Sequence, residues 1–311
     1  MKICSLLPSA TEIVYSLGLG DCLAGVTHEC DYPPQAASLP VVTSSNVVDS
    51  AASSAEIHRQ VSQSRFSGIS IYQLDEEALV KADPGLILTQ QLCDVCAVSY
   101  GDVKEAVRRL PGDRPILSLE PHNVEGIMET IRRVSESAGV PERGQAFCQG
   151  LQERIEKTRE RAQEASREPQ RVLALEWLDP PFYGGHWVPE MIAWAGGRDG
   201  LGRPGRPSSQ VTWDEVAAYD PQVIVLMPCG FEVERTCQEF EALSLPRQWE
   251  GLSAVQDGQV YAVNASAYFS RPGPRVVDGL ELLAEILHPQ LFPRRSPPDA
   301  WRSLSPSLIK N

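Results

Sequence analysis

Short apolar runs alternate with helical patterns along the first third of the chain. The run at residues 3–7 ends at Pro8, and residues 13–17 then repeat apolar side chains at the spacing of a helix. Ser9 or Thr11 can cap that helix. Because an alternation of strands and helices is typical of a parallel sheet, we predict an α/β unit here.

The alternation continues beyond this first pair of elements. Asp75 opens a helix with acidic residues in its first turn, where the helix dipole favours them, and Asp83 and Pro84 close it. We expect strands at residues 23–26, 69–72, 86–88 and 115–119, and further helices at residues 56–64, at 103–110 and from Asn123 to about 137.

Residues 142–167 predict one long helix. They are rich in Glu, Arg, Gln, Lys and Ala, and the apolar residues Phe147, Leu151 and Ile155 recur at helical spacing. A helix of roughly 25 residues would be about 37 Å long at 1.5 Å per residue, enough to cross from one domain to another. A charged helix packed on a single domain is the alternative. We favour the bridge because the strand and helix pattern restarts after it.

The second half repeats the pattern of the first. We expect strands at residues 171–175, 223–227 and 260–263 and helices at 188–195 and from Gly273 or Pro274 to Leu287. The chain after Pro289 is rich in Pro, Ser and Arg and should form an extended tail. The predicted fold is therefore α/β, with two lobes of mainly parallel sheets joined by one long backbone helix. Its expected parts are an N-terminal lobe (1–138), the connecting helix (139–168), a C-terminal lobe (169–290) and the tail (291–311).

Composition narrows the classes of partner. A chain of 311 residues suits two domains, and its net charge of -13 argues against nucleic acid and against an anionic membrane surface. No stretch approaches the roughly 20 apolar residues of a spanning helix. Pro8 and Glu12 interrupt the apolar start, so we expect no secretion signal and eight reduced cysteines in a cytoplasm. If a signal had been removed before residue 1, the expected place would be the periplasm or another extracytoplasmic space. We expect a monomer.

Polar and aromatic residues gather where the predicted strands end. Ligands of open α/β sheets bind at such ends, and the loops after residues 175, 227 and 263 combine aromatic residues with Pro and Gly. The first half offers the helix start at Pro8 and the cluster at residues 27–31. The predicted contact residues are Pro8, Ser9, His28, Glu29, Cys30, Tyr72, Gln91, Cys93, Glu176, Trp177, Phe182, His186, Trp187, Cys229, Tyr268, Phe269 and Arg271.

Some of these residues could ligate a metal. Cys93 and Cys96 have the spacing of a metal or redox pair, and His28 and Cys30 also follow a predicted strand. Imidazole and thiolate ligands suit cobalt, zinc or iron. The alternative is that these cysteines are small buried residues. No spacing in the chain demands a nucleophile paired with a base, so we expect a binding protein, with no cofactor acting as a catalyst.

The sequence resembles the class III substrate-binding proteins of the periplasmic-binding type, and most of all their cobalamin-binding branch. The resemblance rests on residues 5–12, 27–33 and 83–88, on Glu176–Trp177 and on residues 220–226. It implies that a corrinoid is held in a cleft between the two lobes and, in exporting organisms, delivered to an ABC permease. Haem or a ferric siderophore is the alternative ligand, and a corrinoid-modifying or metal-inserting enzyme is the third possibility.

The corrinoid hypothesis assigns two groups of contacts. Trp177, Phe182 and Trp187 would form one wall of the cleft, since a corrinoid offers a broad apolar face with amide edges. His28, Cys30 and Cys93 would face them from the other lobe and could reach the cobalt.

Overall fold

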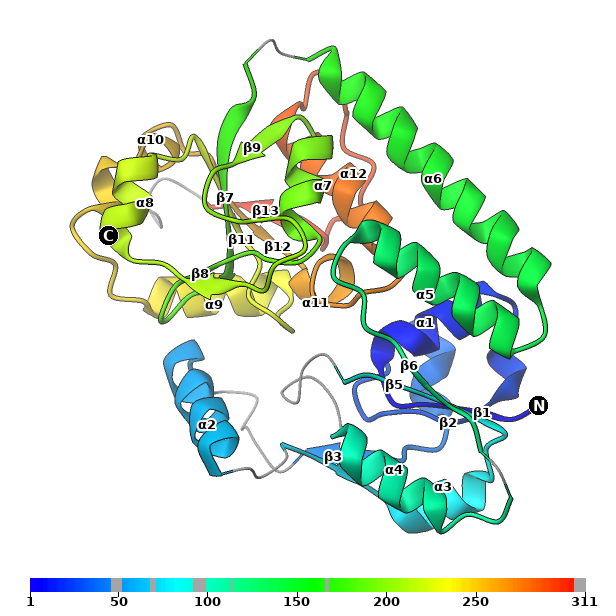
Figure 1. Ribbon diagram of the computed structural model, residues 1–311. Coiled ribbons are helices and arrows are strands. Elements are labelled where there is room, and N and C mark those ends of the chain that lie inside the picture. Colours follow the sequence, from blue (N-terminus) through cyan, green and yellow to red (C-terminus); the bar gives the residue numbers. More distant parts are fainter. Residues whose placement is uncertain (46–51, 68–70, 92–98, 113, 166–167, 305–311) are drawn as a thin grey trace. The chain divides into compact units, whose positions relative to one another are not determined.

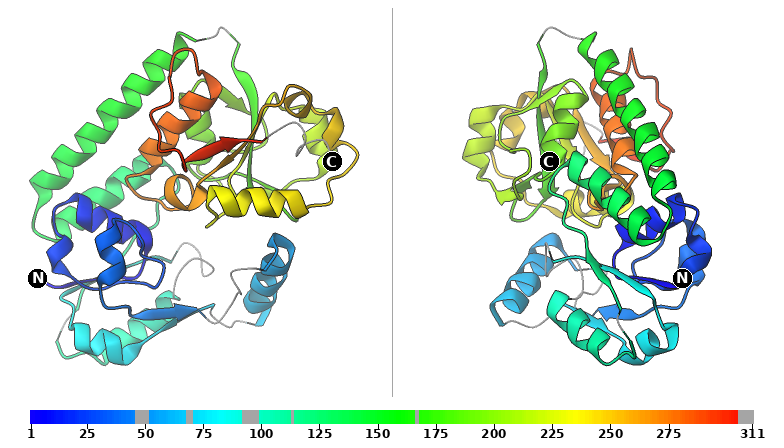
Figure 2. Two further views of the ribbon diagram at one scale, coloured as in Figure 1. Left: turned by 180° about the vertical axis from the view of Figure 1, so that it is seen from behind. Right: turned by 45° about the vertical axis from the view of Figure 1, so that its right-hand side comes forward.

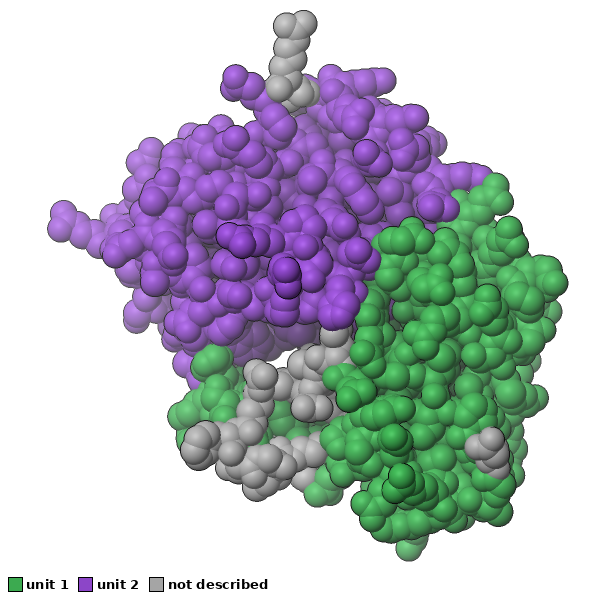
Figure 3. Space-filling model, in the orientation of Figure 1, with its two compact units in different colours: residues 1–52, 56–121, 125–150 green, residues 53–55, 122–124, 151–311 purple. Residues whose placement is uncertain are grey.

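Two compact units make up the chain in the computed structural model, which describes residues 1–45, 52–67, 71–91, 99–112, 114–165 and 168–304 (Figures 1 and 3). Unit 1 comprises Met1–Ala52, Glu56–Pro121 and Glu125–Gly150. Unit 2 comprises Ser53–Ala55, His122–Val124 and Leu151–Asn311. None of the helices in the described residues is long and apolar enough to cross a membrane.

Unit 1 is built on a parallel sheet. Its four strands run in the order β2-β1-β5-β6, and a separate antiparallel pair joins β3 to β4. Its elements are β1 (Ile3–Ser5), α1 (Pro8–Ser16), η1 (Gly20–Cys22), β2 (Leu23–Gly25), η2 (Pro34–Ser38), β3 (Thr43–Ser45), α2 (Ser54–Ser67), β4 (Tyr72–Leu74), α3 (Glu76–Ala82), β5 (Leu86–Thr89), α4 (Tyr100–Arg108), β6 (Ile116–Ser118) and α5 (Val124–Ser137).

Helix α1 begins at Pro8 without a side-chain cap. Leu7 is the N-cap residue, and the fixed φ of proline suits the first turn of a helix. The predicted capping by Ser9 or Thr11 is wrong, because Thr11 lies inside the helix and its hydroxyl donates to Ser5 Oγ at 2.8 Å. The helix buries polar residues such as Thr11 and Glu12 beside the fully buried Ile13 and Val14.

The long helix α6 (Pro141–Gln163) is continuous in every view (Figures 1 and 2). Residues up to Gly150 belong to unit 1 and those from Leu151 to unit 2, as expected of a connecting helix. Within unit 2, Arg154 donates from Nε and a terminal nitrogen to Glu281 at 2.9 and 2.7 Å, and to Asp278 at 2.5 Å. The C-terminal half of α6 is thereby attached to the helix that carries both carboxylates.

Unit 2 is built on a mixed sheet. Parallel strands β7, β11 and β12 form its centre, and antiparallel strands β8, β10 and β13 extend it in the order β10-β8-β7-β11-β12-β13, with β9 also on β7. The elements are β7 (Gln170–Trp177), β8 (Phe182–Tyr183), α7 (Val188–Trp194), β9 (Gly197–Asp199), β10 (Ser209–Gln210), α8 (Trp213–Tyr219), β11 (Val223–Leu226), α9 (Val233–Ala242), η3 (Trp249–Gly251), α10 (Ser253–Gln256), β12 (Val260–Val263), α11 (Ala265–Tyr268), α12 (Val276–Leu287) and β13 (Trp301–Ser303).

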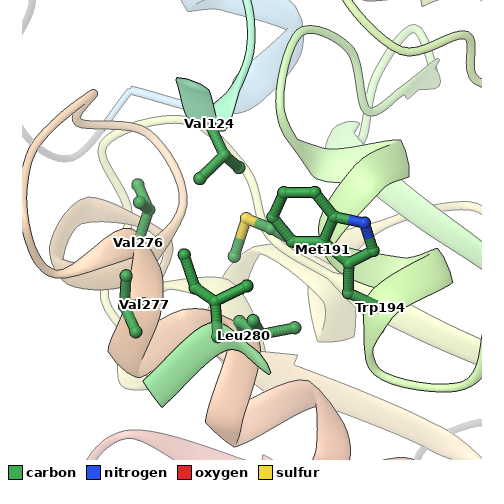
Figure 4. Close-up of a pocket in the computed structure, with 7 residues that line it drawn as sticks. Val124, Met191, Trp194, Val276, Val277 and Leu280 are labelled. Atoms are coloured by element: carbon green, nitrogen blue, oxygen red, sulfur yellow. The ribbon is translucent and has the colours of Figure 1, made fainter. Parts of the chain in front are cut away.

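A small apolar hollow lies where α7 packs on α12. Met191 and Trp194 of α7 lie opposite Val276 and Leu280 of α12, with Val124 at one side (Figure 4). It has no room for a water molecule, whereas ligand pockets typically have volumes of roughly 300–1,000 Å³. We therefore regard it as part of the packing between these helices.

The α/β class with mainly parallel sheets is confirmed, and two local expectations are corrected. The strand expected at residues 69–72 is described at Tyr72–Leu74, where its register is set by pairing with Thr43–Ser45; residues 69 and 70 lie outside the described residues. The tail contains strand β13, which the sequence did not predict and which pairs antiparallel with β12.

The buried carboxylate of Glu285 on α12 anchors the start of this tail. It accepts hydrogen bonds from the backbone N–H groups of Arg295 and Ser296 at 2.7 and 3.0 Å, from the Ser296 hydroxyl at 2.6 Å, and from the Trp301 indole at 3.4 Å. The guanidinium of Arg294 lies 4.3 Å from the Trp301 ring centroid. The Glu285 carboxylate thus accepts hydrogen bonds that water would otherwise accept in the turn before β13.

Replacing Glu285 should therefore destabilise unit 2. We expect Glu285→Ala to lower the free energy of unfolding by about 2–4 kcal/mol, because several part-buried hydrogen bonds to this one carboxylate are lost together. Urea unfolding followed by circular dichroism measures the effect. Glu250→Ala, which removes an exposed carboxylate from η3, should change stability by less than about 0.5 kcal/mol. Equal stability of the two variants would contradict the anchoring role of Glu285.

His288, directly after α12, should make stability depend on pH. Burial lowers the pKa of its imidazole below 6.5, and backbone groups of Ala195 and Gly196 oppose the effect. A folded-state pKa below the unfolded one means that the contribution is complete above about pH 6.5 and is lost as the pH falls through the folded-state pKa. We expect His288→Gln to reduce the loss of stability between about pH 7.5 and pH 5.5. The control His58→Gln, on α2, should keep the loss seen in the parent chain; the same loss in His288→Gln would refute the assignment.

Candidate functional site

The carboxyl ends of parallel strands meet at one edge of each sheet. In unit 1, β1 ends at Ser5, β5 at Thr89 and β6 at Ser118, and the paired register places these ends side by side. Pro8 and Ser9 begin α1 just beyond β1; Pro8 is partly exposed and Ser9 is buried. Gln91 follows β5 and is exposed. Cys93 and Cys96, predicted to follow the same strand, lie outside the described residues.

A buried chain of hydroxyl and thiol groups connects two of these loops. The Cys30 sulfur lies 3.1 Å from the hydroxyl oxygens of both Thr11 and Thr27, and Thr11 in turn donates to Ser5. Cys30 is only 4% exposed. Nearby, burial and then the proximity of Cys30 raise the pKa of the Cys4 thiol to about 12, so Cys4 is a neutral thiol. In this arrangement Cys30 fixes the loop after β2 against α1, and its contact with a ligand stays a prediction.

Three predicted residues of unit 1 do lie together. The rings of His28 and Tyr72 have centroids 5.5 Å apart, and the Tyr72 hydroxyl donates to Glu29 Oε1 at 2.8 Å. His28 Nδ1 lies 2.9 Å from Thr43 Oγ1, and the His28 backbone N–H donates to the same oxygen at 3.2 Å. His28 and Glu29 are exposed and Tyr72 partly so, which leaves this group open to a ligand.

The predicted metal site remains a prediction. Within the part of the chain that the structure describes, no three His, Cys, Asp or Glu side chains are grouped so as to hold a metal ion. The proposed set of His28, Cys30 and Cys93 includes one residue outside that part.

In unit 2, a carboxylate organises the loops after β7. Glu176 Oε2 accepts from the Gly185 N–H at 3.0 Å, and the Ser208 hydroxyl also bonds to this carboxylate. Burial raises the pKa of Glu176, and these two hydrogen bonds act against the rise. A Cβ atom on Gly185 would lie 2.2 Å from the Ser208 backbone nitrogen, so only glycine allows the two loops to pack this closely. Glu176 thus holds both loops in place.

His186 occupies a left-handed backbone conformation in the same loop. Its φ is 52°, its N–H donates to the Arg206 carbonyl at 2.6 Å, and its carbonyl accepts from the Gly205 N–H at 2.9 Å. The ring centroid lies 6.0 Å from that of His122 and 5.5 Å from that of Trp187. Burial, and then the neighbouring His122, lower the pKa of His186. The imidazole is therefore neutral at neutral pH and can accept as well as donate.

The aromatic residues of unit 2 divide into two groups. Trp187 is 6% exposed and Phe269 is 3% exposed, and the Trp187 indole donates to the Phe269 carbonyl at 2.8 Å. They pack inside the unit. Besides Glu176, the predicted residues of this unit that keep some exposed surface are Trp177, Phe182, His186, Cys229, Tyr268 and Arg271. These six supply aromatic faces, a cation, an imidazole and a thiol to the strand ends.

The position of the Trp177 side chain depends on residues that the sequence did not single out. Its indole donates to the carbonyls of Ser54 at 3.2 Å and Asp179 at 3.1 Å, and its ring meets that of Phe231 edge-on, with centroids 5.6 Å apart. Ser54 is held in turn by Glu239, which accepts from its N–H and hydroxyl at 2.7 and 2.6 Å. A partner 185 positions away along the chain leaves no local signal in the sequence.

Comparison with known proteins agrees with this architecture. A family model described as "Periplasmic binding protein" matches residues 3–267. The chain is 27% identical over 290 residues to a vitamin B12-binding protein of Vibrio cholerae, covering 92% of this chain and 88% of the relative. It is 24% identical over 298 residues to an uncharacterised ABC transporter substrate-binding lipoprotein of Bacillus subtilis, covering 94% and 81%.

Solved structures give the same fold with different ligands in their names. The periplasmic vitamin B12-binding protein of Vibrio cholerae superposes with a TM-score of 0.65 at 26% identity, over 94% of this chain and 98% of that one. A periplasmic haem-binding protein from Roseiflexus superposes with a TM-score of 0.68 at 20% identity, over 93% and 98%. The predicted two-lobed fold is thus confirmed, and the chain belongs to the periplasmic binding protein family.

Proposed function

We propose that this chain binds a corrinoid of the cobalamin type and presents it, chemically unchanged, to an ABC permease. One observation carries the proposal: the similarity to a vitamin B12-binding protein extends over 92% of the chain at 27% identity. The haem-binding neighbour, at 20% identity, supports only the fold. The name of one relative, an ABC transporter substrate-binding lipoprotein, supports the choice of a permease as partner.

The chemistry of the strand ends suits such a ligand. A corrinoid is a broad, largely apolar disc with neutral amides around its edge and one phosphate on its lower side chain. Trp177, Phe182 and Tyr268 are aromatic residues that stay partly exposed, and their rings can pack against the disc. His28 and Arg271 can donate hydrogen bonds to amide and phosphate oxygens.

Haem is the second candidate, and a particular residue favours it. The pKa of His186 is lowered, so a neutral imidazole is available as an axial ligand for iron. Haem also carries two carboxylates, which would need cationic partners. The ligands that are tested for binding must therefore include haem.

Calorimetry with cobalamin, haemin and a ferric siderophore tests the proposal directly. We expect cobalamin to bind, and neither of the other two to bind as tightly. Tight binding of haemin without binding of cobalamin would transfer the function to the second candidate.

Trp177 should contribute strongly to the affinity for cobalamin. Loss of an aromatic face worth roughly 1.5–3 kcal/mol on burial should weaken binding of the Trp177→Ala variant by about tenfold or more. Trp177→Phe keeps a ring and should retain most of the affinity. Trp194→Ala serves as the matched control. Trp177 is the last residue of β7, whereas Trp194 lies three residues before β9, and β9 pairs with the first residues of β7. Equal losses in Trp177→Ala and Trp194→Ala would contradict a role for Trp177 in ligand contact.

A further inference from the structure

The hydroxyl oxygen of Thr43 lies within hydrogen-bonding distance of two nitrogens of His28. The His28 backbone N–H donates to Thr43 Oγ1 at 3.2 Å, and the ring nitrogen Nδ1 lies 2.9 Å from the same oxygen. Thr43 begins β3 and is 5% exposed, whereas His28 is exposed. Thr43 was not among the residues that the sequence singled out.

The hydrogen-bond capacity of the hydroxyl fixes the direction of the second bond. A threonine hydroxyl has one proton to donate and two lone pairs. One lone pair is used by the His28 backbone N–H, and among the described residues His28 Nδ1 is the one acceptor within reach of the proton. If Nδ1 carried a proton instead, the buried hydroxyl would have nothing to donate to, which is unfavourable.

We propose that Thr43 is a positioning residue that holds neutral His28 as the Nε2–H tautomer, so that Nε2–H donates to an oxygen of the ligand. The oxygen belongs to an amide carbonyl or phosphate of the corrinoid, and this half of the proposal rests on the proposed function. His28 Nε2 makes no hydrogen bond within the described chain. In this tautomer Nδ1 is occupied and Nε2 carries a proton, so His28 serves as a hydrogen-bond donor and not as a cobalt ligand.

The surroundings hold the imidazole in one orientation. The Tyr72 ring lies against it at a centroid distance of 5.5 Å and an angle of 41°, and the Tyr72 hydroxyl is itself fixed by Glu29. Strands β3 and β4 pair through Ser45 and Tyr72, so Thr43 and Tyr72 belong to one small sheet. A donor held on both sides loses little freedom when it meets a ligand.

Nitrogen NMR of the free protein tests the tautomer without any ligand. Protein labelled with ¹⁵N-histidine at about pH 8, above the ordinary histidine pKa of about 6.5, should show His28 with protonated Nε2 and unprotonated Nδ1. The signal is assigned by its loss in His28→Gln. A protonated Nδ1 in the parent protein would overturn the proposal.

Two substitutions at position 43 test the role of the hydroxyl. Thr43→Ser keeps the donor and should keep the single tautomer, whereas Thr43→Val removes it and should give a mixture of both tautomers. An unchanged single tautomer in Thr43→Val would show that Thr43 does not set it. If Thr43→Val folds poorly, the parent spectrum still decides which tautomer is present, and a protonated Nδ1 there would overturn the proposal.

Binding of cobalamin tests the second half of the proposal, that His28 Nε2–H donates to the ligand. We expect Thr43→Val and His28→Gln to weaken binding by about three- to tenfold, the value of one hydrogen bond, and Thr43→Ser by less. The visible spectrum of bound cobalamin should be the same in the parent and in His28→Gln. A spectral shift would assign His28 to the cobalt and overturn the donor role. Failure of the parent to bind cobalamin would refute the proposed function and this ligand, while the tautomer is decided by the free protein.

Discussion

Parallel strand pairing is the constraint on which the rest of this structure depends. A strand that pairs in parallel with its neighbours must end where they end, so the loops after β1 and β5 share one edge, as do those after β7 and β11. Strands β1, β5 and β11 are buried along their whole length, and β7 is buried in its apolar middle. The candidate contact residues that follow these strands therefore lie in loops at one edge of each sheet, so the position of a residue relative to its strand bears on whether it can meet a ligand.

Loops at such an edge keep their shape because buried polar groups replace the missing ladder of backbone hydrogen bonds. In unit 1 the hydroxyls of Thr11 and Thr27 enclose the Cys30 sulfur. In unit 2 the Glu176 carboxylate joins the Gly185 loop to the loop that carries Ser208. A buried polar group is costly without partners, so each of these contacts favours one loop conformation over others. We infer that these polar residues act on the ligand through the loops that they fix.

The sequence predicted most of what periodicity controls. The long helix and the parallel strands β1, β5, β7 and β11 lie where apolar spacing placed them, because burial of an apolar face is a local property of the chain. Strand β13 and the shift of β4 were missed, since their registers depend on β12 and β3, distant in sequence. Prediction of the site was limited in the same way. An aromatic residue in a glycine-rich loop looks the same in the sequence whether it is buried, as Trp187 is, or stays partly exposed, as Trp177 does.

Charge bears on the choice between the two candidate ligands. Haem brings two carboxylates, whereas a corrinoid with amide side chains brings a single phosphate, and the chain has a net charge of -13. A negative overall field slows the approach of a doubly anionic ligand more than that of a largely neutral one. Local cations could reverse this preference, but among the predicted contact residues Arg271 is the one permanent cation, and His186 is held neutral by burial and by His122. A site composed mainly of aromatic rings and neutral donors selects its ligand by shape and hydrogen bonding. These are the contacts by which a corrinoid, with amides around its edge, would be told apart from haem.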